Sequence, residues 1–254
     1  MHKHRKKFIT LTRTQQFLAG AIVFVLISAA LVAYISGLMA QERTTNAIYL
    51  QIENTSKARA ESLSNLTAQL ALDVRFLAKT PPIAGIARAT KNDGYDPQEE
   101  SSIHVWQSRL ETIFKAYTES REDIAQVRLI GTANEGTELV RVERKADEAS
   151  AVPRSLLQSK SSELYFSEGI QTPYDHVYFS DITLNRELGI IQNPHVPMLR
   201  ALTPVFGDNN ERFGMVVINQ DVSAALEHLT IDDDPDLKIY ATGPDGGYLI
   251  NPNK

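Results

Sequence analysis

The feature that most constrains this chain is an uncharged apolar run near its N-terminus. Residues 17–39 contain no formal charge. As an α-helix, such a run spans about 34 Å, which is enough to cross a hydrocarbon core of about 30 Å. The run is longer than the apolar region of about 7–15 residues in a secretory signal peptide, and Leu38-Met39-Ala40 is a poor cleavage site. The sequence therefore predicts an uncleaved transmembrane helix over residues 17–39.

Charge is distributed unevenly on the two sides of this run. Residues 1–16 hold five of the 26 basic residues, whereas all 31 acidic residues lie beyond residue 40. By the positive-inside bias, the basic tail of residues 1–16 is expected in the cytoplasm, and the bulk of the chain in the periplasm, anchored in a bacterial inner membrane. So acidic a domain is a poor candidate for nucleic-acid binding, and no nucleic-acid partner is expected.

Two helices are predicted over residues 41–120. Residues 41–79 lack Pro and Gly, and their apolar residues recur at spacings of three and four. The second half of this stripe is expected to pack under a sheet. The first half follows the membrane span directly, and we interpret it as a stalk that forms a homodimer with a second copy. Pro81-Pro82 ends the helix, and a second helix is predicted over residues 98–120 with Trp106 on its apolar face.

Five strands are predicted after these helices, because β-branched and aromatic residues are dense between turn signals. A short helix is expected over residues 160–170, and an eleven-residue excursion, 185–195, is longer than a hairpin needs. The pattern predicts an α+β fold with an antiparallel sheet and helices on one side. A linking helix over residues 222–229 and a last hairpin over 237–250 complete the predicted elements. The predicted strands are 124–130, 137–144, 176–184, 196–206 and 212–221.

A resemblance to a known family lies in the last three of these strands. They carry V-Y-x-S-x-x-x-L-N-R-E-x-G, then P-x-x-P-x-L-R-A-x-T-P-V-F and G-x-V-V-I-N-x-D, and the earlier hairpin reads QVRLIGTANEGTELVRVER. These segments resemble the extracytoplasmic double-Cache (PAS-like) sensor domain of bacterial transmembrane histidine kinases, diguanylate cyclases and chemoreceptors. The resemblance implies a membrane-distal Cache domain over residues 121–229 and the beginning of a truncated membrane-proximal one over 230–254. It implies a signal-input region that binds a small solute and signals through its N-terminal helix.

Motifs for catalysis and for metal binding are absent from the sequence. There is no Gly-rich phosphate loop, no H-E-x-x-H, no Cys-based metal site, no G-x-S-x-G and no kinase or GGDEF signature. We therefore expect no enzymatic activity in this chain, no cofactor and no metal, although the parent protein would be a histidine kinase or a diguanylate cyclase. An alternative interpretation is a bitopic structural or assembly protein that presents an α+β domain to partners without a small-molecule site.

Candidate ligand-binding residues are polar side chains set into apolar strands. Arg200 lies in MLRALTPV and Asp221 closes VVINQD. A charge that faces a pocket is held by a partner or a ligand, because its desolvation alone costs several kcal/mol. The alternative for Arg200 is a solvent-facing side chain or a structural ion pair. Tyr165 and Tyr178 could wall a pocket, since Tyr combines apolar area with a hydroxyl, or could simply pack in the core.

The resemblance leaves the ligand class open. In the amino-acid-sensing branch of the family, an Arg-x-Trp-Tyr motif on the inserted helix clamps the ligand carboxylate, and an Asp at the end of the last strand holds its amine. Asp221 matches that Asp, whereas Glu163, Tyr165 and Phe166 stand where the motif would be. The ligand is then an amine facing Glu163 and Asp221, or a carboxylate held by Arg200. The site is predicted between the sheet and a layer of residues 160–170 and 185–195, which includes Asn185 and Arg186.

Overall fold

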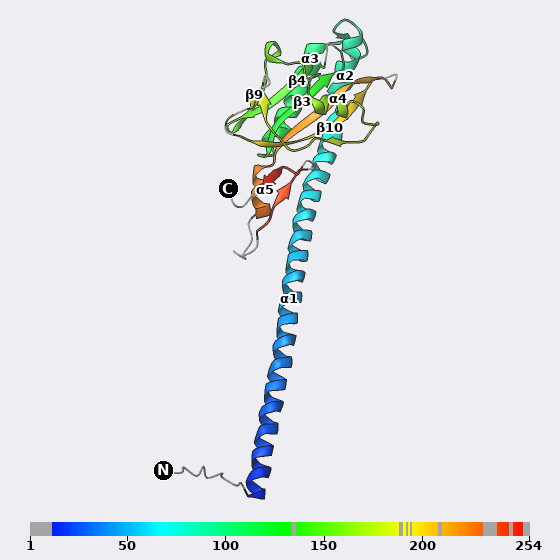
Figure 1. Cartoon of the computed structure of the whole chain (residues 1–254). Coiled ribbons are helices and arrows are strands. Elements are labelled where there is room, and N and C mark those ends of the chain that lie inside the picture. The colour runs from blue at the N-terminus through cyan, green and yellow to red at the C-terminus, as the bar shows by residue number, and fades with distance from the viewer. Residues whose placement is uncertain are drawn as a thin grey trace. The chain divides into compact units, whose positions relative to one another are not determined.

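The computed structural model describes residues 12–133, 136–187, 190–191, 193, 195–207, 210–230, 238–243 and 246–250. The chain divides into two units, residues 1–61 and residues 62–254. One long helix, α1 (Arg13–Ala78), begins in the first unit and ends in the second (Figure 1). The second unit holds all the strands, so the predicted sheet domain belongs to it.

The first unit contains the apolar part of α1. Among the described residues, α1 is the one helix long and apolar enough to cross a membrane, with a window of mean hydropathy 2.6 that is not buried inside the protein. The predicted span of residues 17–39 lies within α1. Ile48 and Ile52, in the stretch predicted to be a stalk, are exposed.

The second unit is built on a seven-stranded antiparallel sheet, which confirms the predicted α+β class. Its strand order is β5-β4-β3-β11-β10-β6, and β7 also pairs with β10. The central strands β3, β11 and β10 are rich in apolar, β-branched residues, which suits burial on both faces. The strands are β3 (Ile124–Gly131), β4 (Glu138–Lys145), β5 (Glu148–Ala151), β6 (Tyr178–Phe179), β7 (Thr183–Leu184), β10 (Pro197–Phe206) and β11 (Arg212–Asp221).

Two features of the sheet differ from the prediction. The single strand expected over residues 176–184 is two short strands, β6 and β7, because the hydroxyl of Ser180 between them accepts the backbone N–H of Arg200. The short strand β5 was not predicted at all, since four residues with little apolar character carry almost no pattern. The excursion 185–195 contains a small hairpin of β8 (Arg186–Glu187) and β9 (Ile190–Ile191).

The helices also begin and end differently from the prediction. Pro81 and Pro82 do end α1, but they then form the first turn of an unpredicted helix, α2 (Pro81–Lys91), where a missing N–H has no cost. A two-strand bridge of β1 (Tyr95–Asp96) and β2 (Ser101–Ser102) replaces the start of the predicted helix 98–120. The remaining helices are α3 (Ile103–Glu119), the 3₁₀ turn η1 (Arg154–Leu156), α4 (Leu164–Gly169) and α5 (Ser223–Thr230).

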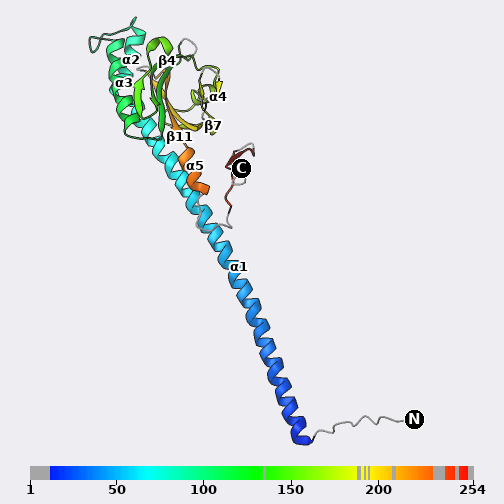
Figure 2. The same ribbon diagram turned by 90° about the vertical axis from the view of Figure 1, so that its left-hand side faces the viewer.

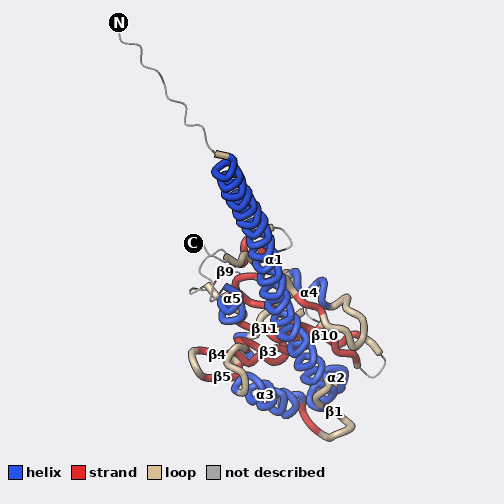
Figure 3. Tube along the Cα trace, turned by 90° about the horizontal axis from the view of Figure 1, so that it is seen from below, coloured by secondary structure: helices blue, strands red, loops and turns tan. Residues whose placement is uncertain are grey.

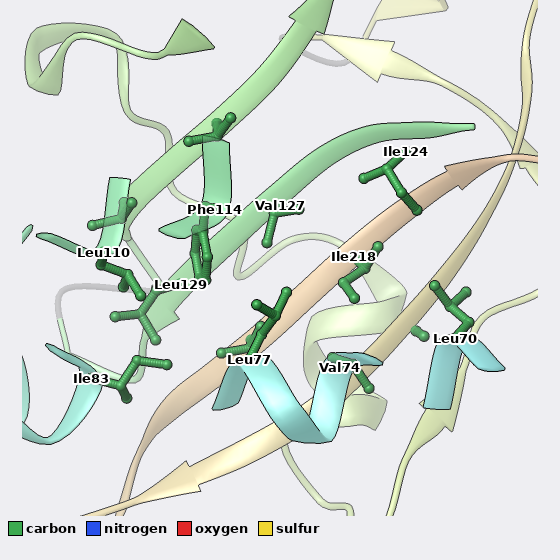
Figure 4. Close-up of a cluster of buried hydrophobic side chains, with 14 of the residues drawn as sticks. Leu70, Val74, Leu77, Ile83, Leu110, Phe114, Ile124, Val127, Leu129 and Ile218 are labelled. Carbon is green, nitrogen blue, oxygen red and sulfur yellow. The ribbon is translucent and has the colours of Figure 1, made fainter. Parts of the chain in front are cut away.

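Helices cover one face of the sheet. The C-terminal end of α1, with α2 and α3, packs on that face around a cluster of fully buried side chains (Figure 4). Figure 2 shows α2 and α3 on one side of the sheet and α4 on the other, and Figure 3 shows α3 beside β4 and β5. The predicted packing of the second half of the stripe is therefore correct. The cluster includes Leu70, Val74, Leu77, Ile83, Leu110, Phe114, Ile124, Val127, Leu129 and Ile218.

The opposite face carries a smaller apolar cluster and the polar residues. Because side chains alternate along a strand, Leu199 and Ala201 of β10 face the helices, whereas Arg200 and Leu202 face the other way. Leu202 packs with Tyr165 of α4 in this second cluster. Because of this alternation, the side chain of Arg200 lies on the face of the sheet away from α1, α2 and α3.

A last hairpin follows α5. It pairs β12 (Ala241–Thr242) with β13 (Tyr248–Ile250), which are shorter than the strands predicted for this region. Residues 231–237 lie outside the described residues. The interpretation of residues 230–254 as the beginning of a second Cache domain stays a prediction.

Candidate functional site

A cavity of about 320 Å³ lies on the sheet face opposite the three helices. Strands β3, β11 and β10 supply its floor, α4 and the loop before it supply one wall, and β6, β7 and β9 with their loops supply the other. Ligand pockets for small molecules begin at about 300 Å³, so the cavity has room for a small solute. The predicted position of the site, between the sheet and the layer of residues 160–170 and 185–195, coincides with this cavity.

Tyr165 of α4 lies between two arginines of the floor. Its ring centroid is 5.6 Å from the guanidinium carbon of Arg128 on β3 and 5.3 Å from that of Arg200 on β10. Its hydroxyl accepts a hydrogen bond of 3.2 Å from Arg128 Nη1. Burial raises the pKa of Tyr165, so the phenol is neutral at pH 7. The ring thus offers its face to cations rather than a negative charge.

Arg128 is anchored in a polar network beneath the cavity. It is 3% exposed, and its Nη2 donates to Asn219 Oδ1 at 2.6 Å. Asn219 in turn donates to Gln126 Oε1 at 3.3 Å, and Arg128 Nη1 lies 3.5 Å from Glu138 Oε1. Arg128 Nε is buried without a hydrogen-bond partner among the described residues. The network holds the guanidinium in place without using all of its donors.

Arg200 has fewer partners. It is 7% exposed, and its Nη1 donates to Thr183 Oγ1 at 2.7 Å. Its Nε is buried without a partner, and within the described part of the chain no carboxylate forms an ion pair with it. Burial, and then the neighbouring charge of Arg128, lower the pKa of Arg200. An arginine side chain nevertheless stays protonated at pH 7, so the cavity contains a buried cation on which the charge of Glu163 acts without forming a described ion pair.

Most of the predicted site residues meet in this cavity. Tyr165, Tyr178, Glu163, Asn185 and Arg200 all line it. Glu163 precedes the first turn of α4 and is half-buried. The hydroxyl of Tyr178 donates to Glu168, and burial together with that bond raises the pKa of Tyr178 to about 12. A ligand-binding role for the five residues stays a prediction.

The other two predicted site residues are Asp221 and Arg186. Asp221 is absent from the lining, and its Oδ1 accepts the backbone N–H of Ser223 at 2.8 Å, at the first turn of α5. The position of Asp221 follows from the end of β11, where the chain turns into α5 and the carboxylate satisfies a helix donor, and its ligand-binding role stays a prediction. Arg186 lies in β8, but its side chain is outside the described structure.

Sequence reasoning missed Arg128 and Asn219, which lie in the floor of the cavity. Arg128 interrupts the apolar strand QVRLIG just as Arg200 interrupts its own strand, so the same signal could have found it. Val127 and Leu129 on either side face the helices, and this alternation places Arg128 on the opposite face. Asn219 has no comparable signal, because a neutral polar residue near a strand end is common.

Acidic side chains occupy the walls rather than the floor. Glu163 is half-buried and Asp181 is exposed, while Lys160 is buried and donates to Gln158 Oε1 at 2.8 Å. Among the described residues, no group of three or more His, Cys, Asp or Glu could hold a metal ion. The site therefore combines buried positive charge with acids nearer to solvent.

Comparison with known proteins places the chain among sensor domains. Residues 98–254 match the family described as "Bacterial histidine kinase, sensor domain". A domain of a sensory box/GGDEF family protein from Vibrio parahaemolyticus has a TM-score of 0.61 at 23% identity, over 79% of this chain and 72% of that one. The extracellular domain of histidine kinase vpHK1S-Z8 gives 0.60 at 23% identity, over 79% and 69%.

The V. cholerae histidine kinase DctB sensor domain is more distant. Its TM-score is 0.50 at 14% identity, over 74% of this chain and 61% of that one. No curated protein matches the chain. At these identities the structural likeness shows a shared fold.

Proposed function

Because the chain belongs to the bacterial histidine kinase sensor-domain family, we propose that it is the membrane-anchored extracytoplasmic input region of a signal-transduction protein and binds a small solute. The observation that carries the proposal is the cavity itself. It combines walls of apolar, aromatic and polar side chains with Arg128 and Arg200, two buried charges whose donors are only partly used by the described residues. Few convergent polar groups in a mostly apolar concavity are the usual features of a small-molecule site.

Anchoring through α1 is supported by its apolar window and by the basic residues before it. The N-terminus would then lie in the cytoplasm and the sheet unit in the periplasm. A reporter fusion after Lys254 tests this topology: alkaline phosphatase there should be active and a cytoplasmic reporter inactive. Activity of the cytoplasmic reporter alone would contradict the proposed orientation.

Transmission through α1 is supported by the strands that the site and the helix share. Arg128 faces the cavity, while its neighbour Leu129 belongs to the core cluster that includes Leu77 of α1. Arg200 and Ala201 of β10 are arranged in the same way. A solute that shifts these strands has a packed route to α1, because close-packed cores transmit displacement rather than absorb it.

A solute screen tests the proposal on the full chain in detergent. Compounds of anionic, zwitterionic, neutral and cationic classes are added, and a true ligand raises the melting temperature through the free energy RT ln(1 + [L]/Kd). Leu184 lines the cavity, so Leu184→Trp should fill it and abolish the shift. The matched control is Leu156→Trp, at a position 61% exposed and away from the cavity, which should keep the shift.

Two results would contradict solute binding at this site. One is that no compound of any class stabilises the chain. The other is that stabilisation survives Leu184→Trp. The first result would favour a structural or assembly protein that presents the same domain to partners.

A further inference from the structure

We infer that the solute carries a carboxylate-class anionic group that binds both Arg128 and Arg200 at the floor of the cavity. This inference rests on the proposed function, since it names the chemical class of the ligand for the same site. It excludes an amine or other cation as the group held at the floor.

The first step is the count of unused donors. An arginine carries five N–H groups, and among the described residues the Arg200 guanidinium donates to Thr183 alone. The Nε atoms of Arg128 and Arg200 are both buried and without a partner there. A buried donor left unpaired is costly, and the planar fork of a guanidinium matches a carboxylate with two parallel bonds. An anionic ligand would supply the missing acceptors.

The second step is the balance of buried charge on this face of the sheet. Among the described residues, three arginines of this face are at most 7% exposed, namely Arg128, Arg141 and Arg200. Two described acids of this face are similarly buried: Glu138 pairs with Arg128 and Arg141, and Glu143 pairs with Arg141. Arg128 and Arg141 even lie directly opposite each other on β3 and β4. The surplus is positive, so an anion lowers the electrostatic cost of this interior and a cation raises it.

The third step concerns the acids of the walls. Glu163 and Asp181 also line the cavity, yet neither forms a described ion pair with Arg200. They would repel a second negative charge placed away from the floor. We therefore expect one compact anionic end, with a neutral or weakly polar remainder directed toward the walls. Burial and the charge of Arg128 lower the pKa of Arg200 more than the charge of Glu163 raises it, which is consistent with a cation that has no carboxylate in direct contact.

The amine alternative loses its main residue in the structure. It required Asp221 beside Glu163, but Asp221 Oδ1 is bound to the N–H of Ser223 instead. Glu163 by itself is half-buried on the wall and not at the floor.

The binding experiment uses matched probes that differ in charge. Propionate and benzoate are compared with propionamide, benzamide, propylammonium and inorganic phosphate, on the full chain in detergent, by calorimetry and thermal shift. The carboxylates should bind, and the amides and the amine should not. Arg128→Gln and Arg200→Gln should each weaken carboxylate binding by about tenfold or more, as expected for lost charged hydrogen bonds. The control Arg154→Gln makes the same change at an exposed position outside the cavity and should bind like wild type.

A second measurement needs no ligand. If Arg200 is kept for binding, Arg200→Met should melt at or above the wild-type temperature without ligand, because a buried unpaired charge is replaced by an apolar side chain of similar length. The control is Arg144→Met. Arg144 donates to the carbonyls of Thr118 and Arg121, so its loss should lower the melting temperature.

The outcomes separate the two proposals. Binding of amides or propylammonium that Leu184→Trp abolishes would keep the solute site but overturn the anionic ligand. Carboxylates bound equally by Arg200→Gln and wild type would also overturn it, as would a melting loss in Arg200→Met equal to that in Arg144→Met. Phosphate bound in preference to both carboxylates would replace the carboxylate class by the phosphate class and so contradict the inference as stated. If none of these probes binds while the broader screen finds a solute whose stabilisation Leu184→Trp abolishes, the inference fails and the proposed function stands.

Discussion

A carboxylate oxygen of Asp73 on α1 lies 2.6 Å from a guanidinium nitrogen of Arg121, which also pairs with Asp123 at 2.8 Å just before β3. Asp123 Oδ2 accepts from Gln220 Nε2 on β11 at 2.5 Å. Tyr117 of α3 completes the group with a hydrogen bond of 2.9 Å to Asp73. This polar chain joins α1 to the central strands at the edge of their apolar contact.

These contacts make the free energy of unfolding depend on pH under acidic conditions. Burial opposes ionisation of Asp123, but hydrogen bonds from Arg121 and Gln220 outweigh it and lower the pKa of Asp123. A carboxyl whose pKa is lower in the folded state adds stability above its unfolded pKa of about 3.9, and this is lost as the pH falls through the folded value. Urea unfolding from pH 7 to pH 2 should show a smaller acid loss in Asp123→Asn than in wild type. Parallel curves for the two proteins would contradict this assignment.

Truncation of the central core should be severe. Ile218 on β11 is fully buried in the cluster beneath α1. Ile218→Ala is expected to lower the free energy of unfolding by about 2–5 kcal/mol, through lost transfer energy and a residual cavity. Val105→Ala on α3 removes apolar atoms at a position 42% exposed and should cost much less. Urea unfolding followed by circular dichroism measures both, and equal losses would show that the core is elsewhere.

The close packing of α2 on α3 predicts that Gly85→Ala destabilises the protein, which is the opposite of its usual effect in a helix. In an ordinary helix, Gly→Ala stabilises by about 1 kcal/mol. A Cβ at Gly85, however, would lie 2.3 Å from the indole of Trp106, so Gly85→Ala should destabilise instead, by about 1–3 kcal/mol for overpacking. The chain has a single Trp, so its fluorescence reports this contact directly. In a Trp106→Leu background the penalty should shrink, and an unchanged penalty would mean that the indole is not what the new methyl group meets.

Asp221 offers a test that separates a structural acid from a ligand contact. Loss of its bond to the Ser223 N–H should cost about 0.5–2 kcal/mol of stability, as for other residues that cap helices. Asp221→Ser keeps an acceptor and should recover much of this, whereas Asp221→Ala should not. Binding of any validated solute should be unchanged in both variants. Weaker solute binding in Asp221→Ala, with unchanged stability, would show that Asp221 contacts the ligand.

The proposed pairing of α1 with a second copy can be tested with cysteines, because the chain has none of its own. Ile48 and Ile52 lie four residues apart and are exposed, as an unpaired helix stripe would be. Single Cys replacements at positions 45–56 should crosslink between copies with a period of three to four residues. Crosslinking at all positions equally, or at none, would argue against a paired stalk.

The sequence alone determined the long strands, the apolar part of α1 and the family. Residues 212–221 were predicted as a strand and form β11, because a short continuous run of apolar, largely β-branched residues between turn signals favours a buried strand. The family expected from the sequences of the predicted strands is confirmed by the match over residues 98–254. Arg200 was recognised as a candidate because a charge inside an apolar strand needs a local explanation.

Only the tertiary structure decided which polar residues meet. Arg128, Tyr165 and Arg200 are far apart in the chain, and they converge because β11 pairs with both β3 and β10 while α4 covers the same face. That convergence depends on strand order and on which face each residue takes, and a shift of one residue in register would reverse the face. Asp221, on the same strand as Asn219, does not line the cavity, because the chain turns into α5 there and its carboxylate accepts a hydrogen bond from the backbone N–H of Ser223. Local patterns are read from neighbours in sequence, whereas a binding site is made by neighbours in space.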